Sequence, residues 1–267
     1  MRQLFLFISF LILSFSCLLG HATTVTNGDR SYQEKDFTKA LQYYREQVVS
    51  APSSSGYYNL GNTYYRLKEY GQSVLAYRRA LRLDPGNTDA RHNLSLVETH
   101  LTNPISKTDN SVWEALLNDW IDVHSLAFWT YCIFIFLLVS FLGLCIWRFS
   151  SRIFVQKTGF SLCCIGVPLV FLSVFSAYRA HTLYNDTTTA VVTGTSLQTS
   201  TTESGLGKAG PTLYEGTTVH ILDHVSKTTY KIQLPNGVSV FCKVNGLTLV
   251  AEKTLIASFF GKGIPFI

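Results

Sequence analysis

The chain has 267 residues, of which 47% are apolar and 15% are charged, and its formal net charge is +5. The basic excess is not gathered on one polar region, because residues 23–110 carry 11 Lys and Arg against 9 Asp and Glu, and residues 182–267 carry 6 against 5. Nucleic-acid-binding domains concentrate basic residues on one face, so we expect no nucleic-acid partner. Length alone suggests one or two soluble domains, but the apolar residues are concentrated in three runs that separate two polar regions.

The N-terminal residues have the pattern of a secretory signal peptide. One basic residue precedes an apolar core over 4–15, and the small residues Gly20 and Ala22 form a small-x-small cleavage site. We therefore predict a signal peptide over 1–22 and export of the chain that follows. Two alternatives remain open, which are lipidation of Cys17 and an uncleaved N-terminal anchor.

The next region contains an internal repeat. The segments KDFTKALQYYREQVVSAP (35–52) and KEYGQSVLAYRRALRLDP (68–85) align without a gap, and ARHNLSLVETHL (90–101) has the pattern of one more helix. A period of about 33 to 34 residues is typical of stacked helix–turn–helix units. The pattern predicts an all-α repeat array over 23–103, with two and a half units.

The second unit resembles the tetratricopeptide repeat. Small residues at fixed places let the paired helices approach closely, tyrosines fill the space between them, and a proline ends the second helix. Lys68 and Ser73 stand where glycine and alanine are common in the family. The residues that take packing positions of the repeat are Tyr57, Leu60, Gly61, Tyr64, Tyr77, Ala80 and Pro85.

A repeat array of this class implies a concave inner surface that binds a protein partner. Such units do not bury their apolar faces alone, so we expect the following segment, another copy or a partner to cap the stack. For any single residue of the inner surface, an ordinary core or solvated role is the alternative. The predicted contact residues are Tyr58, Asn62, Tyr65, Arg66 and His92.

The segment SVWEALLNDWIDVHS follows the repeats and has apolar residues at helical spacing. It predicts an amphipathic helix over 110–124. Two interpretations stay open, because such a helix can lie at a membrane surface or pack on its own domain.

Two long apolar runs, 126–147 and 158–178, come next. About 21 residues of α-helix span roughly 30 Å, the thickness of the hydrocarbon core of a bilayer, and neither run has the polar stripe of a buried soluble helix. The connection RFSSRIFVQK (148–157) has three basic and no acidic residues. Basic connections stay in the cytoplasm, so the pattern predicts two transmembrane helices with a cytoplasmic loop and both polar regions outside.

From residue 187 onward, apolar and polar residues alternate with the period of a half-buried strand. The triplet Ala190-Val191-Val192 opens this region, and Pro235-Asn236-Gly237 has the composition of a tight turn that requires a positive φ. About five short strands indicate a small all-β barrel over 187–251, with a tail over 252–267. The alternating segments are Thr218–Leu222, Tyr230–Leu234 and Val238–Cys242.

The β region resembles a bacterial SH3-like domain. The segment LYEGTTVHIL (213–222) fits the L-x-x-G-x-x-V-x-V-L strand of that family, and Phe241 departs from it by standing where tryptophan is usual. The resemblance implies that the domain binds peptides or cell-wall peptide stems, or serves as a spacer. We interpret His220 and His224 as surface residues at strand edges.

We find no catalytic motif and predict no enzyme, no metal and no cofactor. The sequence has no G-x-S-x-G, no H-E-x-x-H and no phosphate loop. Five of the six cysteines lie in apolar runs, Cys242 lies in the β region, and no C-x-x-C occurs. We interpret them as small apolar residues, and a bridge from Cys145 to Cys163 or Cys164 is the alternative.

The predicted fold class is a multidomain membrane protein: a tetratricopeptide repeat array, two transmembrane helices and a small SH3-like barrel. This order of parts, with the run YYNLGNTYYRL and the basic connection, is similar to the BatE family of Bacteroides aerotolerance operons. The resemblance implies a two-pass protein of a bacterial inner membrane, with both soluble domains periplasmic, that acts as a scaffold for other Bat-type membrane proteins in an envelope complex linked to aerotolerance or stress. The alternative is a cell-wall-binding or sensing protein that engages peptidoglycan through its SH3-like domain.

Overall fold

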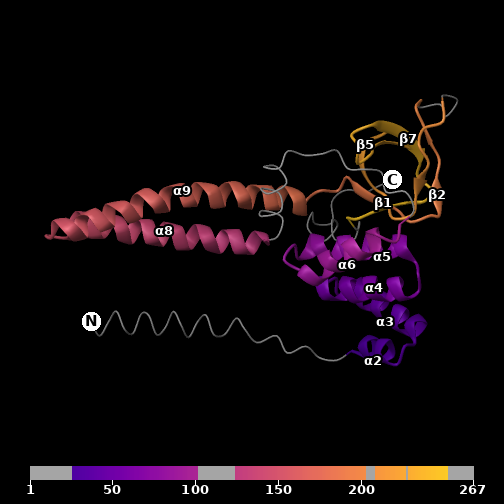
Figure 1. Ribbon diagram of the computed structural model, residues 1–267, viewed down its shortest axis with the longest axis horizontal. Helices are drawn as coiled ribbons and strands as arrows, with labels where there is room; N and C mark the ends of the chain where they lie inside the picture. The colour runs from indigo at the N-terminus through magenta and orange to yellow at the C-terminus, as the bar shows by residue number, and fades with distance from the viewer. Residues whose placement is uncertain (1–25, 102–123, 203–207, 227, 252–267) are drawn as a thin grey trace, which may run out of the picture.

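In the computed structural model, the described residues are 26–101, 124–202, 208–226 and 228–251. The predicted signal peptide (1–22), nearly all of the predicted amphipathic helix (110–124) and the tail (252–267) lie outside them. Figure 1 shows three parts. Helices α2 to α6 form a stack, α8 and α9 form a long hairpin that projects away from it, and a β region lies beside α5.

Four of the five helices of the stack begin at residues whose side chains cap them. Thr26 and Asp29 form a reciprocal capping box, and the side chains of Asp36, Ser53 and Asn87 each accept a hydrogen bond from a backbone N–H of the following first turn. These caps satisfy backbone N–H groups that have no partner within the helix. The helices are α2 (Asn27–Gln33), α3 (Phe37–Ser50), α4 (Ser54–Arg66), α5 (Tyr70–Leu83) and α6 (Thr88–Glu98).

The stack consists of two helix pairs, α2–α3 and α4–α5, followed by the single helix α6. Lys35 and Lys68 separate the two helices of each pair, at φ values of 63° and 64°. This left-handed conformation is one that glycine adopts without steric cost. It explains why glycine is common in the family at the place of Lys68.

Close approach of the helices depends on one glycine in each pair. A Cβ added to Gly61 would lie 2.7 Å from the ring of Tyr77, and one added to Gly28 would lie 2.7 Å from the ring of Tyr44. The two glycines are repeat equivalents, and so are the two tyrosines. The same packing solution is therefore used twice.

The hairpin helices α8 (Leu126–Phe149) and α9 (Ile153–Tyr184) are long and apolar enough to cross a membrane. At 1.5 Å per residue they measure about 36 and 48 Å. Small residues line the seam between them, since a Cβ on Gly143 would lie 2.8 Å from the carbonyl oxygen of Gly159. Such seams let helix backbones approach closely in membrane proteins.

Both helices extend beyond the predicted spans. The predicted ten-residue connection (148–157) is mostly helical, and only residues 150–152 separate α8 from α9. Residues 153–157 contain no proline or glycine, so nothing in that stretch interrupts a helix. The five described cysteines are free, including Cys145, Cys163 and Cys164.

The β region contains the predicted alternating strands but does not form the predicted closed barrel. Its six-stranded sheet has the antiparallel order β3-β7-β6-β5-β1-β8, in which β3 and β8 are edges, and β2 pairs separately with β4. Gly237 has the predicted positive φ, 83°, in the turn between β6 and β7. The strands are β1 (Thr189–Val192), β2 (Ser196–Leu197), β3 (Thr199–Ser200), β4 (Leu213–Tyr214), β5 (Thr218–His224), β6 (Thr229–Gln233), β7 (Ser239–Lys243) and β8 (Leu247–Leu249).

Strand β1 joins the β region to the helix stack. Ala190 and Val192 lie in the core of the sheet, whereas Val191 lies in the core of the helices, and all three are fully buried. Because successive side chains of a strand point to opposite faces, a continuous apolar run fits a strand that is covered on both sides. The β region, which the sequence pattern indicates to be a domain of its own, therefore packs directly on α5.

Polar contacts close the same interface. The backbone N–H of Gly71, in the first turn of α5, donates to Oε1 of Glu215 at 2.6 Å, and Nη2 of Arg79 donates to the carbonyl oxygen of Leu249 in β8 at 3.0 Å. Glu69, the N-cap of α5, makes no side-chain capping bond. A carboxylate from the β region thus caps a helix of the repeat.

Candidate functional site

The inner side of the helix stack contains a groove of about 260 Å³. Its walls come from α2, α4 and α6, and Tyr77 of α5 lies among its lining residues. The side chains are aromatic or polar, with one leucine. They are Tyr32, Tyr58, Asn62, Tyr65, Arg66, Tyr77, Asn93 and Leu96.

A hydrogen-bond network centred on Asn62 orders part of the groove. The Tyr77 hydroxyl donates to Oδ1 of Asn62 at 2.6 Å, and Nδ2 of Asn93 donates to the same oxygen at 2.8 Å. Burial raises the pKa of Tyr77, so its hydroxyl stays protonated and keeps donating. Because the oxygen of Asn62 accepts both bonds, the amide N–H groups of Asn62 are the ones left to donate to a ligand.

Aromatic rings and a cation form another part of the groove. Nε of Arg66 donates to the hydroxyl of Tyr32 at 3.3 Å, and this bond raises the pKa of the guanidinium, which remains charged. The ring of Tyr65 packs against those of Tyr70 and His100, with centroid separations of 5.9 and 5.6 Å. Its orientation is therefore set by its neighbours before any ligand arrives.

Four of the five predicted contact residues come together in this groove: Tyr58, Asn62, Tyr65 and Arg66. His92 does not line it and is exposed on α6. The residues predicted to pack the repeat are buried in the helix core, except Pro85, which is half-buried after the end of α5. Tyr77 is both buried and part of the groove.

Sequence reasoning missed Tyr32, Asn93 and Leu96. Tyr32 had a signal, because it precedes its repeat equivalent Tyr65 by one period of 33 residues. Extending the repeat alignment backward from Lys35 finds it. Asn93 had no such signal, because its role depends on how α6 packs beside α4.

The comparison with protein families matches residues 54–87 to the tetratricopeptide repeat. These residues include α4 and α5, so the match falls on the unit whose inner helix carries the central residues of the groove. No curated protein matches the chain. No solved structure matches it either.

A tetratricopeptide repeat is a non-catalytic unit of protein–protein interaction, and its presence implies a protein partner. Among the residues that the structure describes, no three His, Cys, Asp or Glu side chains gather to hold a metal ion. Burial raises the pKa of the Cys242 thiol to about 11, so this cysteine is protonated and unreactive at neutral pH. The chemistry offered by the groove is aromatic packing and hydrogen bonding.

Proposed function

We propose that the protein is a non-enzymatic, membrane-anchored adaptor whose repeat groove binds an extended segment of a partner protein. The groove itself carries this proposal, because it combines ordered aromatic walls with amide donors and a fixed guanidinium. Tyrosine and arginine are enriched where protein interfaces gain most of their affinity. In this arrangement Asn62 donates to a backbone carbonyl of the partner, and Tyr58 and Tyr65 pack against its side chains.

The hairpin supports a membrane anchor. Its outward face carries large apolar side chains that are mostly exposed, such as Phe134, Phe141, Phe171 and Phe175. An exposed apolar surface of this size is unusual for a soluble protein, whereas lipid covers it without cost. Small residues fill the seam and large ones face outward, which is the distribution expected in a bilayer.

The charges at the hairpin tip support an orientation. Arg148, Arg152 and Lys157 lie around the turn between α8 and α9, and no acidic residue lies within 148–157. By the positive-inside rule the tip is cytoplasmic, and the helix stack and the β region then lie on the opposite side of the membrane. Together with the resemblance to BatE, these charges support our proposal that the groove lies in the periplasm, beside other proteins of an inner-membrane complex linked to aerotolerance.

The β region has a supporting role in the proposal. Gly216 has a φ of 79° within the segment that fits the SH3-like strand, which supports the SH3-like interpretation. Its strand β1 and residue Glu215 are engaged by α5. We therefore propose that this domain braces the repeat stack and leaves partner binding to the groove.

Photo-crosslinking tests the adaptor function. A photoreactive amino acid replaces Leu96, at the edge of the groove, in the full chain in its native membrane, and the crosslinked partner is identified. Purified partner is then titrated against Asn62→Ala and Tyr65→Ala variants, which we expect to bind at least about tenfold more weakly, because each substitution removes a central contact. The matched control is Tyr43→Ala, a tyrosine of α3 outside the groove. Equal affinity of all variants would contradict the proposal.

Two further measurements test the proposed orientation and the alternative function. A reporter fused at Ser151 should be active in the cytoplasm, and a periplasmic signal there would reverse the proposed orientation. Sedimentation of the full chain with purified cell wall, unaffected by Asn62→Ala, would favour the wall-binding alternative.

A further inference from the structure

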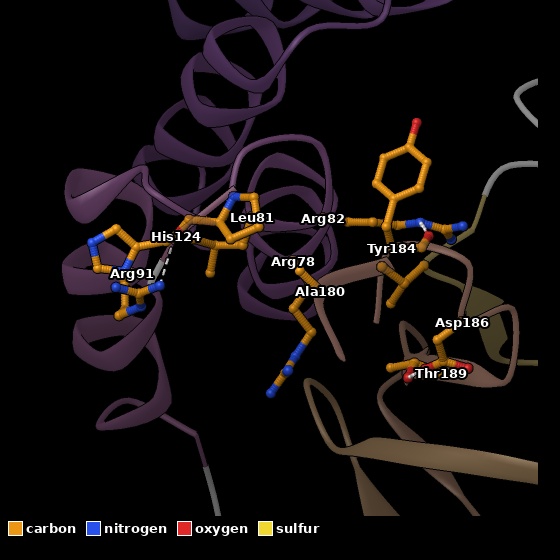
Figure 2. Close-up of a pocket in the computed structure, with 11 residues that line it drawn as sticks. Arg78, Leu81, Arg82, Arg91, His124, Ala180, Tyr184, Asp186 and Thr189 are labelled. Carbon is orange, nitrogen blue, oxygen red and sulfur yellow. Dashed lines mark hydrogen bonds between the residues drawn. The ribbon is translucent and has the colours of Figure 1, made fainter. Parts of the chain in front are cut away.

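A second cavity, of about 290 Å³, lies where the three parts of the molecule meet. Its lining comes from α5 and α6 of the repeat stack, the C-terminal end of α9, strand β1 and the residue that precedes the cap of α8. Figure 2 shows Arg78 and Arg82 extending from α5 on one side and Asp186 and Thr189 on another. Nothing in the groove function uses this site.

The cavity is rich in fixed positive charge. Three arginines line it, Arg78, Arg82 and Arg91, against the single carboxylate of Asp186. Glu98, which forms an ion pair with Arg78 at 3.2 Å, is not part of the lining. The remaining lining residues are mainly apolar, such as Leu81, Ala180 and Val250. The site therefore has a cationic part and an apolar part.

Two of these guanidinium groups are incompletely satisfied. Nε of Arg78 and Nη1 of Arg82 are buried, and neither has a hydrogen-bond partner among the described residues. Burial lowers the pKa of both side chains. A buried donor without an acceptor destabilises the protein, so an anion that reaches these atoms would remove an existing energetic cost.

The arginines are also held in position. Nε of Arg82 donates to the carbonyl oxygen of Tyr184 at 3.0 Å, and the guanidinium lies over the ring of Tyr184 at 5.9 Å. Nη2 of Arg91 donates to the carbonyl oxygen of Pro85 at 2.6 Å. Side chains ordered before binding lose less entropy when a ligand arrives.

The cavity lies at the end of the hairpin opposite its tip. Ala180 and Tyr184 belong to the end of α9, and His124 immediately precedes the N-cap of α8. If α8 and α9 span a bilayer, these residues lie at the level of the lipid headgroups, where basic pockets bind anionic lipids. The apolar lining faces the same junction.

We propose that this junction cavity binds a phosphate group, with Arg78, Arg82 and Arg91 as its donors. The planar guanidinium matches the oxygens of a phosphate with paired hydrogen bonds. The phosphate comes from an anionic phospholipid headgroup or from a soluble phosphate ester. Only the lipid source rests on the proposed membrane insertion, because the arginine chemistry is independent of it.

Titration of the full chain, purified in a neutral detergent, tests the site. Phosphatidylglycerol and inorganic phosphate are added separately, with zwitterionic phosphatidylcholine as the reference lipid, and binding is followed by native mass spectrometry. We expect phosphatidylglycerol to bind at least about tenfold more tightly than phosphatidylcholine. Removing two charged donors in Arg82→Gln/Arg91→Gln should abolish this preference. The matched control is Arg45→Gln, because Arg45 also makes one hydrogen bond and lies over a tyrosine ring, but on α3.

Each outcome either tests the anion site or identifies the source of the phosphate group. Preference for phosphatidylglycerol, lost in the double variant and kept in the control, supports a lipid headgroup. Binding of inorganic phosphate alone, with the same dependence on the arginines, supports a soluble ester. Binding of neither anion, or equal binding by the double variant, overturns the site.

A gain-of-affinity variant guards against a simple folding defect. Asp186→Asn removes the negative charge that faces the arginines and should strengthen phosphate binding several-fold, with the gain shrinking as salt is raised. Unchanged or weaker binding in a folded Asp186→Asn protein would contradict the electrostatic basis of the site. Extraction of the protein from membranes at alkaline pH is scored separately, so a failure of membrane insertion is distinguishable from a failure of anion binding.

Discussion

The inner side of the helix stack is open, whereas the outer side is covered by the β region, although both sides belong to the same repeat. On the inner side, α4 presents Tyr58, Asn62 and Tyr65 to an open groove. On the outer side, α5 is covered by β1 and β8 of the same chain. In the α4–α5 pair, the first helix carries the central residues of the groove and the second packs on the β region.

This difference shows how a short repeat array is stabilised. Two and a half units leave apolar surface that neighbouring units would bury in a longer array. Here Val191 and Val250 of the β region enter the helix core and cover part of that surface. The chain therefore supplies part of its own cap.

Placing a charge at Val191 should have the largest effect on the outer side. Val191→Asp buries an unpaired carboxylate at a position that is 0% exposed, and we expect a loss of at least about 3 kcal/mol in the free energy of unfolding. Hydrogen exchange of the full chain should show faster exchange in both α5 and β1. The control is Val238→Asp, at an exposed position of the same domain. Faster exchange in β1 alone would mean that the two parts are not coupled.

Filling the close contact between α4 and α5 should have the next largest effect. Gly61→Ala places a methyl group 2.7 Å from the ring of Tyr77, and overpacking of this kind costs about 1–3 kcal/mol. The displaced tyrosine also disturbs its bond to Asn62, so partner affinity should fall together with stability. Gly194→Ala is the control, because its added Cβ would have ordinary contacts at 3.6 Å. Equal stability of the two variants would contradict the close packing of Gly61 against Tyr77.

Asp29 occupies in the first repeat unit the position that Asn62 occupies in the second. It accepts hydrogen bonds from the backbone N–H of Thr26 at 2.7 Å and from the hydroxyl of Tyr44 at 2.7 Å. Asp29→Asn should cost about 1 kcal/mol at neutral pH, because these bonds lose their charge-assisted part.

The stability that Asp29 provides should depend on pH. Burial raises its pKa, but the bonds from Tyr44 and Thr26 outweigh burial and hold the pKa below the ordinary value of 3.8. The contribution is therefore complete above pH 3.8 and is lost as the pH falls through the lower folded-state pKa. Denaturant unfolding of wild type and Asp29→Asn should give a difference that shrinks on acidification, and a difference independent of pH would contradict this assignment.

Removing the interdomain cap should have the smallest effect. Glu215→Gln keeps an acceptor for the N–H of Gly71 but removes the charge at the helix N-terminus, which is worth about 0.5 kcal/mol. Hydrogen exchange should accelerate in the first turn of α5 and leave α4 unchanged. Glu69→Gln, at the N-cap that makes no side-chain bond, should change exchange less. A larger effect at Glu69 would mean that Glu215 is not the cap.

Much of the fold was predictable because its signals are local. Gly61 and Ala80 near aromatic residues, the two apolar runs and the alternation over 218–242 depend on neighbours within one helix or strand. The repeat is recognised by aligning two segments that are 33 residues apart. The part of the groove formed by Tyr58, Asn62 and Tyr65 was predictable, because these residues lie on one face of a helix in the recognised repeat unit. Asn93 and Leu96 were not, because they come from a helix whose angle to α4 is set by packing.

The sequence by itself therefore determined the elements and the inner face of the repeat, since helix and strand periods assign a side to every residue. It also determined that the hairpin is long and apolar enough to cross a membrane. Only the tertiary structure decided that β1 is covered on both faces, that the sheet stays open and packs on α5, and that Arg78, Arg82 and Arg91 surround one cavity. The packing on α5 depends on contacts such as Gly71–Glu215 and Arg79–Leu249, whose residues are 144 and 170 positions apart, and no local pattern encodes them.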